Sequence, residues 1–359
     1  MKKKNIRKVV SSKKSLLTTI LLIFSLICLI VCKSNSDSNR KIISHEVIGS
    51  DSLGYVRDMV ICNDYLVLLD VKPLNRMKNQ LRVYDLKNFN FLYSTGKVGS
   101  GPGEFLQGMS LNKIAYGKGG FSLLDLSYKK VIIFQPDNSG RLTYSKAIQL
   151  KEGRAYMPVI VNDSTIFSLG LELFSGRFAV YNSLGNMIET LGELPPGKEK
   201  DTPVPVHQQA CKGLMRMTPD GEKLVVSYQF AELIDIYNTE GVLLRRITGR
   251  IGMPKYRPIV RNGYPTFIIN EETILGYLDI EVTNKYIIAL FSGESASTAQ
   301  YESDKIRVYT LVDGDLIKTN VLDTKISQIE IDVVNNRLLA VSYFPFPKVY
   351  SFDLQKMLY

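Results

Sequence analysis

The sequence predicts an all-β protein, a six-bladed β-propeller whose blades are four-stranded antiparallel sheets. The main observation is a pattern that occurs six times: a β-rich run, a short polar break and an aliphatic–aromatic pair, usually followed by a polar turn. The aromatic residues of successive pairs lie 41 to 72 residues apart, and one propeller blade needs roughly 40 to 50 residues. Helical periodicity is absent beyond residue 32, which argues against a parallel sheet with helical crossovers.

Each copy of the pattern is assigned to one blade. The pairs are Val83-Tyr84, Ile133-Phe134, Val180-Tyr181, Ile236-Tyr237, Val308-Tyr309 and Val349-Tyr350. The β-rich runs before them span 65–71, 121–126, 165–169, 223–228, 286–291 and 337–343. A β-sandwich could hold as many strands, but it would not explain why one pattern returns six times.

The two ends of the mature chain complete the ring. The sixth copy stops after its third strand, and residues 41–48 form a lone strand-like run before the first complete blade. We expect this N-terminal run to pair with the last blade, because such closure removes two exposed sheet edges.

The positive charge is concentrated at the N-terminus. The 359 residues include 45 Lys and Arg against 35 Asp and Glu, a formal net charge of +10. Residues 1–32 contain basic residues and no acidic one, which leaves 38 basic against 35 acidic residues in the remainder. With so little net charge outside the leader, nucleic acid is not an expected partner.

Residues 1–32 are typical of an export signal, with a basic start, an apolar run over 16–31 and then Cys32. The apolar run is shorter than the roughly 20 residues that span a bilayer, and a retained anchor is the alternative. Leu29-Ile30-Val31-Cys32 resembles a bacterial lipoprotein signal, with Val31 where a small residue is usual. The resemblance implies lipid attachment at Cys32, a flexible tether over 33–40, and a propeller over 41–359 held at a membrane of the cell envelope. The sequence leaves the membrane and its side open.

A glycine-rich segment, Gly99-Ser100-Gly101-Pro102-Gly103-Glu104-Phe105, lies between the first two copies. Its glycines permit positive φ, Pro102 favours a turn, and Phe105 can pack under the next blade. A phosphate loop would need a following helix, and the sequence predicts none there. The segment resembles the link between blades of NHL-type and TolB-like six-bladed propellers, a set that includes many bacterial lipoproteins. The resemblance implies a fold and an envelope location, and no particular activity.

Familiar catalytic patterns are missing from the sequence. It has two histidines and no Trp, and it contains no HExxH, CxxC, EF-hand or GxSxG motif. Cys62 and Cys211 are expected to be buried free thiols. Carboxylates can converge in a ring without any linear signature, so a Ca²⁺ site or an acid–base pair in the central channel stays open.

We expect a ligand at the face formed by the loops between second and third strands and by the links between blades. These loops are rich in basic and aromatic residues, which suits a glycan or a protein partner. Asp70 and Asp125 end the second strands of the first two blades, where each would either face the channel with a partner or metal, or cap a turn. The candidate binding residues are Asp70, Arg76, Asp125, Lys129, His207, Arg257, Tyr301 and Phe344.

These observations predict an exported, membrane-tethered binding module that performs no catalysis. The alternative is an exported lyase or hydrolase that acts on a glycan or peptide with carboxylates at the channel mouth, with or without Ca²⁺. A third hypothesis is a scaffold subunit of an envelope complex, which an exposed apolar patch would support.

Overall fold

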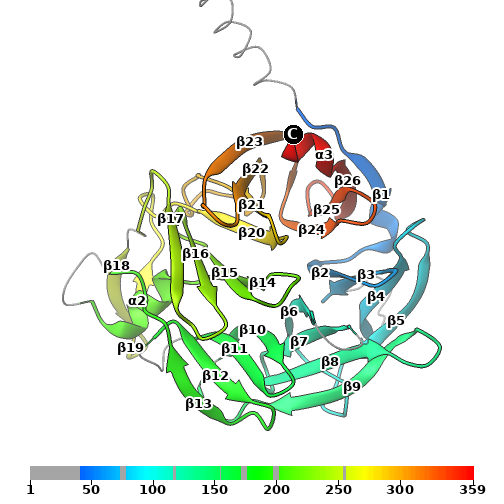
Figure 1. The fold of residues 1–359 in the computed structure, drawn as a ribbon, viewed down its shortest axis with the longest axis horizontal. Coiled ribbons are helices and arrows are strands. Elements are labelled where there is room, and N and C mark those ends of the chain that lie inside the picture. Colours follow the sequence, from blue (N-terminus) through cyan, green and yellow to red (C-terminus); the bar gives the residue numbers. More distant parts are fainter. Residues whose placement is uncertain are drawn as a thin grey trace, which may run out of the picture. The chain divides into compact units, whose positions relative to one another are not determined.

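A computed structural model describes residues 41–72, 78–115, 119–153, 155–170, 176–196, 202–253 and 256–359. In these ranges, six four-stranded antiparallel sheets follow one another around a ring as the blades of a β-propeller (Figure 1). The predicted fold class is therefore confirmed. Residues 1–40 lie outside the described ranges, together with the predicted signal, Cys32 and tether.

The first three blades follow the chain order without interruption. Blade 1 contains β2 (Val56–Cys62), β3 (Tyr65–Asp70), β4 (Asn79–Asp85) and β5 (Phe91–Lys97). Blade 2 contains β6 (Gly108–Lys113), β7 (Phe121–Asp125), β8 (Lys130–Pro136) and β9 (Leu142–Gln149). Blade 3 contains β10 (Ala155–Asn162), β11 (Thr165–Gly170), β12 (Phe178–Asn182) and β13 (Met187–Leu191).

The other three blades complete the ring. Blade 4 contains β14 (Gly213–Met217), β15 (Lys223–Tyr228), β16 (Leu233–Asn238) and β17 (Leu243–Thr248). Blade 5 contains β20 (Tyr277–Val282), β21 (Tyr286–Phe291), β22 (Ser303–Thr310) and β23 (Leu316–Ile326). Blade 6 contains β24 (Gln328–Asp332), β25 (Arg337–Ser342), β26 (Lys348–Asp353) and the N-terminal β1 (His45–Ile48).

Ring closure by the N-terminal strand is confirmed. β1 pairs antiparallel with β26, with His45 opposite Ser351 and Glu46 opposite Tyr350. An ion pair of 2.6 Å between Lys348 Nζ and Glu46 Oε2 supports the same contact. The first and last strands of the described chain therefore belong to one blade.

Apolar side chains fill the spaces between neighbouring blades. Six buried clusters each draw on two adjacent blades, so that every blade interface has its own core. The second strands β3, β7 and β21 are nearly continuous buried apolar runs because blades cover both of their faces. The fourth strands β5 and β17 lie at the rim and are largely exposed or half-buried.

Two of the links between blades contain elements that the sequence analysis did not predict. The link from blade 3 to blade 4 holds helix α2 (Val204–Ala210), and the link from blade 4 to blade 5 holds the hairpin of β18 (Arg257–Arg261) and β19 (Tyr264–Ile268). A third unpredicted element lies at the C-terminus, where α3 (Leu354–Leu358) follows β26. Helices of five and seven residues are too short to produce a visible 3.6-residue period. Within the described residues, no helix has the length and apolar character needed to cross a bilayer.

Candidate functional site in the central channel

The first strand of each blade faces the centre of the ring, where the labels β2, β6, β10, β14, β20 and β24 meet in Figure 1. Five of these strands carry charged side chains, and β10 carries none. The charged residues that come together are Asp58 on β2, Lys113 on β6, Arg216 on β14, Asp279 and Glu281 on β20, and Glu330 on β24. All of them except Lys113 are buried.

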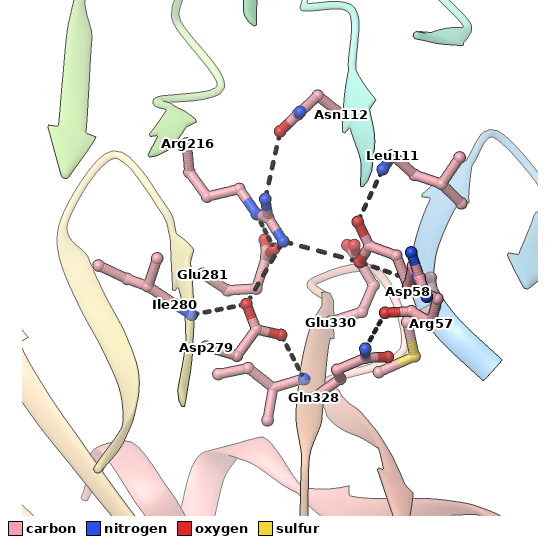
Figure 2. A network of polar contacts seen from close by, with 12 residues as sticks. Arg57, Asp58, Leu111, Asn112, Arg216, Asp279, Ile280, Glu281, Gln328 and Glu330 are labelled. Atoms are coloured by element: carbon pink, nitrogen blue, oxygen red, sulfur yellow. Dashed lines mark hydrogen bonds and ion pairs between the residues drawn. The ribbon is translucent and has the colours of Figure 1, made fainter. Parts of the chain in front are cut away.

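Arg216 is the centre of this group, as Figure 2 shows. Its Nε donates to Glu281 Oε1 at 2.7 Å, and its Nη2 donates to Asp279 Oδ1 at 3.4 Å. Nη2 also lies 3.9 Å from Asp58 Oδ1. Nη1 donates to Asn112 Oδ1 at 3.2 Å. One guanidinium thus links side chains from four blades, since its fixed fork of donors can serve several acceptors at once.

Asp58 and Asp279 occupy the same place in blades 1 and 5. Each sits where the pairing of the first two strands shifts register, and each accepts a hydrogen bond from the next first strand in the ring. Asp58 Oδ2 accepts from Leu111 N at 2.7 Å, and Asp279 Oδ2 accepts from Ile329 N at 2.8 Å. These two carboxylates therefore join neighbouring blades as well as contacting Arg216.

Glu330 and Lys113 form a further ion pair of the channel. The Glu330 side chain is 2% exposed, whereas that of Lys113 is 43% exposed. Lys113 Nζ therefore reaches from solvent to a carboxylate that is inside the channel.

Burial is the main cause of the raised pKa values of the carboxylic acids in this group. It raises the pKa of Asp58 to about 6, that of Asp279 to about 7 and that of Glu330 to about 8. Arg216 opposes the increase at each acid without cancelling it, and Lys113 does the same at Glu330. Burial also disfavours the Arg216 cation, but the surrounding carboxylates outweigh this effect and raise the pKa of Arg216 above its ordinary value.

A cavity of about 210 Å³ adjoins the charged group. Asn112, Lys113, Arg216, Glu281 and Glu330 contribute to its wall. The wall also includes exposed residues that follow first strands, among them Asn63, Ala115 and Pro219. The cavity therefore opens to solvent on the side of the turns between first and second strands.

A comparison with known families identifies the architecture. The family model described as "TolB-like 6-blade propeller-like" matches residues 38–334. The chain belongs to this family. The resemblance inferred from the glycine-rich link is thereby confirmed.

A solved structure supports the TolB-like fold independently. A Bacteroides fragilis protein, proposed in its description to be exported, is 14% identical in sequence and superposes with a TM-score of 0.56. The match covers 87% of the TolB-like chain and 94% of the other chain. No curated protein matches the sequence.

Two of the predicted binding residues hold loops in this TolB-like propeller. Asp70 is fully buried, accepts a hydrogen bond from Gly54 N at 3.0 Å and lies 3.0 Å from Arg82 Nε. Asp125 is also fully buried and accepts hydrogen bonds from the backbone N–H groups of Leu106, Gln107 and Ser127. Gly54, Leu106 and Gln107 precede the first strands of blades 1 and 2, so each Asp fixes the segment that enters its own blade.

The glycine-rich segment is a link between blades in the structure. Gly101 N donates to Glu104 Oε2 at 2.9 Å, and a Cβ on Gly99 would lie 2.1 Å from the same oxygen. Gly103 has φ +72°, and Phe105 is fully buried in the core between blades 1 and 2. These contacts explain the glycines by close approach of the backbone and do not require a ligand.

The remaining predicted residues lie in separate loops. His207 on α2 contacts Tyr256 OH through Nδ1 at 3.0 Å and Pro195 O through Nε2 at 2.5 Å. Arg257 begins the hairpin that packs against α2 and is exposed. Lys129, Tyr301 and Phe344 are exposed on three other loops, and Arg76 lies outside the described residues. The cavity wall contains none of the predicted binding residues.

Sequence reasoning missed the channel residues, although a signal for them exists. Acidic and basic residues interrupt first strands that are otherwise apolar, as in Val56-Arg57-Asp58-Met59-Val60 and Tyr277-Leu278-Asp279-Ile280-Glu281. A charge within a strand that must be buried needs a partner, which marks it as a candidate site residue.

Among the described residues, no group of three or more His, Cys, Asp or Glu side chains is arranged to hold a metal ion. The Ca²⁺ hypothesis remains a prediction.

Proposed function

We propose that this TolB-like propeller is an exported, membrane-tethered binding protein that takes a small polar ligand into the cavity of its central channel and performs no catalysis. The observation that carries the proposal is an open cavity of about 210 Å³ whose wall combines buried carboxylates with Arg216 and Lys113. Concave sites with a few convergent polar groups are where small ligands bind in most proteins. An engineered cavity of about 150 Å³ already admits benzene, so this one suits a ligand of somewhat larger size.

The exported and tethered state rests on the leader sequence. Residues 1–32 have the features of an export signal that ends in Cys32, and the similar Bacteroides fragilis protein is itself proposed to be exported. A Cys32→Ser variant tests the tether. We expect the unaltered chain to enter the membrane fraction and incorporate radiolabelled palmitate, and the variant to lose the label. Equal labelling of both chains would contradict lipid attachment at Cys32.

A cavity-blocking variant tests the binding site. Ala115 is exposed at the cavity wall, whereas Ala147 is exposed on β9, outside the wall. We propose a thermal-shift screen of the full chain with amino acids, amino sugars, diamines, neutral sugars and sugar acids, in parallel with Ala115→Trp and Ala147→Trp. A ligand that binds only the folded state raises the melting temperature.

We expect at least one compound class to raise the melting temperature of the unaltered chain and of Ala147→Trp, but not of Ala115→Trp. A shift that persists in Ala115→Trp would place the site elsewhere. A screen without any shift would overturn the small-ligand proposal and favour a protein partner.

A second candidate function is the lyase or hydrolase, and one observation favours it. Glu330 lines the cavity, and burial raises its pKa to about 8, so it is mostly protonated at neutral pH, as a general acid must be. Turnover of a compound identified in the screen, abolished in Glu330→Gln and retained in Glu240→Gln on the turn before β17, would establish this function. Binding without turnover would exclude it for that compound.

A further inference from the structure

The charged group of the channel contains more acids than bases. The titratable side chains of the six first strands in and beside the group are Arg57, Asp58, Lys113, Tyr156, Arg216, Asp279, Glu281 and Glu330. Four of these are carboxylic acids, and three are cations. Three cations cannot neutralise four ionised carboxylates, and leaving a carboxylate buried without compensation is costly.

Asp58 and Asp279 have little capacity left to accept further hydrogen bonds. Both oxygens of Asp58 accept backbone hydrogen bonds, from Met59 N and Leu111 N. Asp279 Oδ1 accepts from Ile280 N and Arg216, while Oδ2 accepts from Ile329 N. Any additional cation would therefore find few free acceptors on these two residues.

Glu281 and Glu330 differ from the aspartates, because each has an oxygen to spare. Glu281 uses Oε1 for Arg216, and Glu330 uses Oε1 for Lys113. Within the described residues, neither Oε2 atom takes part in a hydrogen bond. Both side chains are at least nine-tenths buried, and both line the cavity. Two carboxylates that each have an unused oxygen thus line the cavity.

Lys113 shows which chemical group these oxygens accept. Its ammonium enters from the exposed end of the cavity and binds Glu330, and its side chain remains 43% exposed. The channel therefore already binds one ammonium group from its own chain. Lys113 also occupies part of the space in front of Glu330, where it would compete with a cation from outside.

We propose that the ligand of the cavity carries a primary ammonium group, which Glu281 and Glu330 bind through their free oxygens. This inference rests on the proposed function. An ammonium has three donors and can serve both carboxylates at once. The free protein balances its surplus of carboxylates by holding protons, and the ligand cation replaces them, so that binding releases protons to solvent. The raised pKa values of Asp279 and Glu330, caused mainly by burial, agree with this exchange near neutral pH.

Matched pairs of compounds test the inference on the full chain by titration calorimetry at pH 7. The pairs are 1,4-diaminobutane with 1,4-butanediol, glucosamine with glucose, and Nα-acetyl-lysine amide with its Nε-acetylated form. The first two pairs represent free amines, and the third represents the lysine side chain of a peptide. Titration in two buffers of different ionisation enthalpy measures the protons released.

We expect at least one amine to bind, its neutral counterpart to bind at least tenfold more weakly, and protons to be released. Glu281→Gln and Glu330→Gln should each weaken amine binding by tenfold or more, whereas Glu240→Gln should leave it unchanged. Lys113→Met should strengthen amine binding several-fold, because it removes the competing ammonium. A purely structural role for Glu330 would not produce this opposite response.

The outcomes separate this inference from the proposed function. Equal affinity for an amine and its neutral counterpart, or binding without proton release, would overturn the ammonium proposal and leave the cavity as a ligand site. Binding only of compounds that lack an amine would also overturn the ammonium proposal and leave the cavity as a ligand site. If no compound of any class binds, the proposed function itself fails.

Discussion

Buried carboxylates occur in two settings in this propeller, and the settings differ in whether the acid lines the channel cavity. Asp70 and Asp125, at the ends of second strands, accept hydrogen bonds from nearby backbone N–H groups, and Asp70 also pairs with Arg82. Glu281 and Glu330, on first strands, each have one oxygen in an ion pair, and both residues line a cavity. All four side chains are buried to a similar degree.

The difference shows that burial of an acid is not by itself a sign of function. A buried carboxylate that is bonded to the backbone of nearby loops and lies away from the cavity holds the fold together. A carboxylate with an unused oxygen beside an open cavity has capacity for a ligand. Substitutions in each setting should therefore have different consequences.

The largest effect is expected for Arg216→Met. This change leaves Asp58, Asp279 and Glu281 without their shared cation, and removing one partner of a buried ion pair costs about 3–5 kcal/mol. Urea denaturation at pH 7 measures the free energy of unfolding. Arg245→Met, at an exposed position on β17, is the control and should change it by less than about 0.5 kcal/mol. Equal effects of both variants would show that the channel does not depend on Arg216.

An intermediate effect is expected for Asp70→Asn. The change removes the charge that pairs with Arg82 and weakens the bond from Gly54 N, so unfolding should become easier by about 1–3 kcal/mol. Ligand binding in the channel should be unaffected. Asp64→Asn, an exposed position in the turn after β2, serves as the control for stability. Loss of ligand binding in Asp70→Asn, with the fold intact, would place the site at the opposite face.

A separate effect is expected in the pH dependence of stability. The folded chain retains protons on Asp58, Asp279 and Glu330 up to about pH 6, 7 and 8, whereas the unfolded chain releases them near pH 4. The folded state thus binds more protons over this range, so stability should fall as the pH rises from 5 to 8. Thermal unfolding across this range should show a shallower decline for Glu330→Gln than for Glu240→Gln. Identical slopes would mean that Glu330 does not retain its proton.

The smallest effect is expected for Lys113→Met. The Lys113 side chain is more than one-third exposed, and ion pairs with such exposure contribute about 0–1 kcal/mol. At pH 6 the decrease in the free energy of unfolding should be hardly measurable, because Glu330 is then protonated. At pH 9 the decrease should be larger, because the Glu330 carboxylate has lost its cation. A large loss at pH 6 would show that the ion pair is a structural element of the ring.

The fold could be predicted from the sequence, and the candidate site could not. The six aliphatic–aromatic pairs and the lone strand at residues 41–48 lie in contiguous segments, so their periodicity gives the blades and the ring closure. The channel group combines Asp58, Arg216, Glu281 and Glu330, which are far apart along the chain and meet only when the ring closes. The hairpin of β18 and β19 was missed although Asn262-Gly263, with φ of +51° and +80°, is a typical hairpin turn.

The most direct test of the central claim, that the channel holds carboxylic acids whose charge the protein does not compensate, is a pH titration of side-chain carboxyl ¹³C shifts by NMR. Glu330→Gln and Asp279→Asn provide the assignments. We expect resonances of Glu330 and Asp279 with midpoints near pH 8 and 7 in the free protein, and a downward displacement of both when an amine is added. Midpoints below pH 5 for both residues in the free protein would contradict the claim.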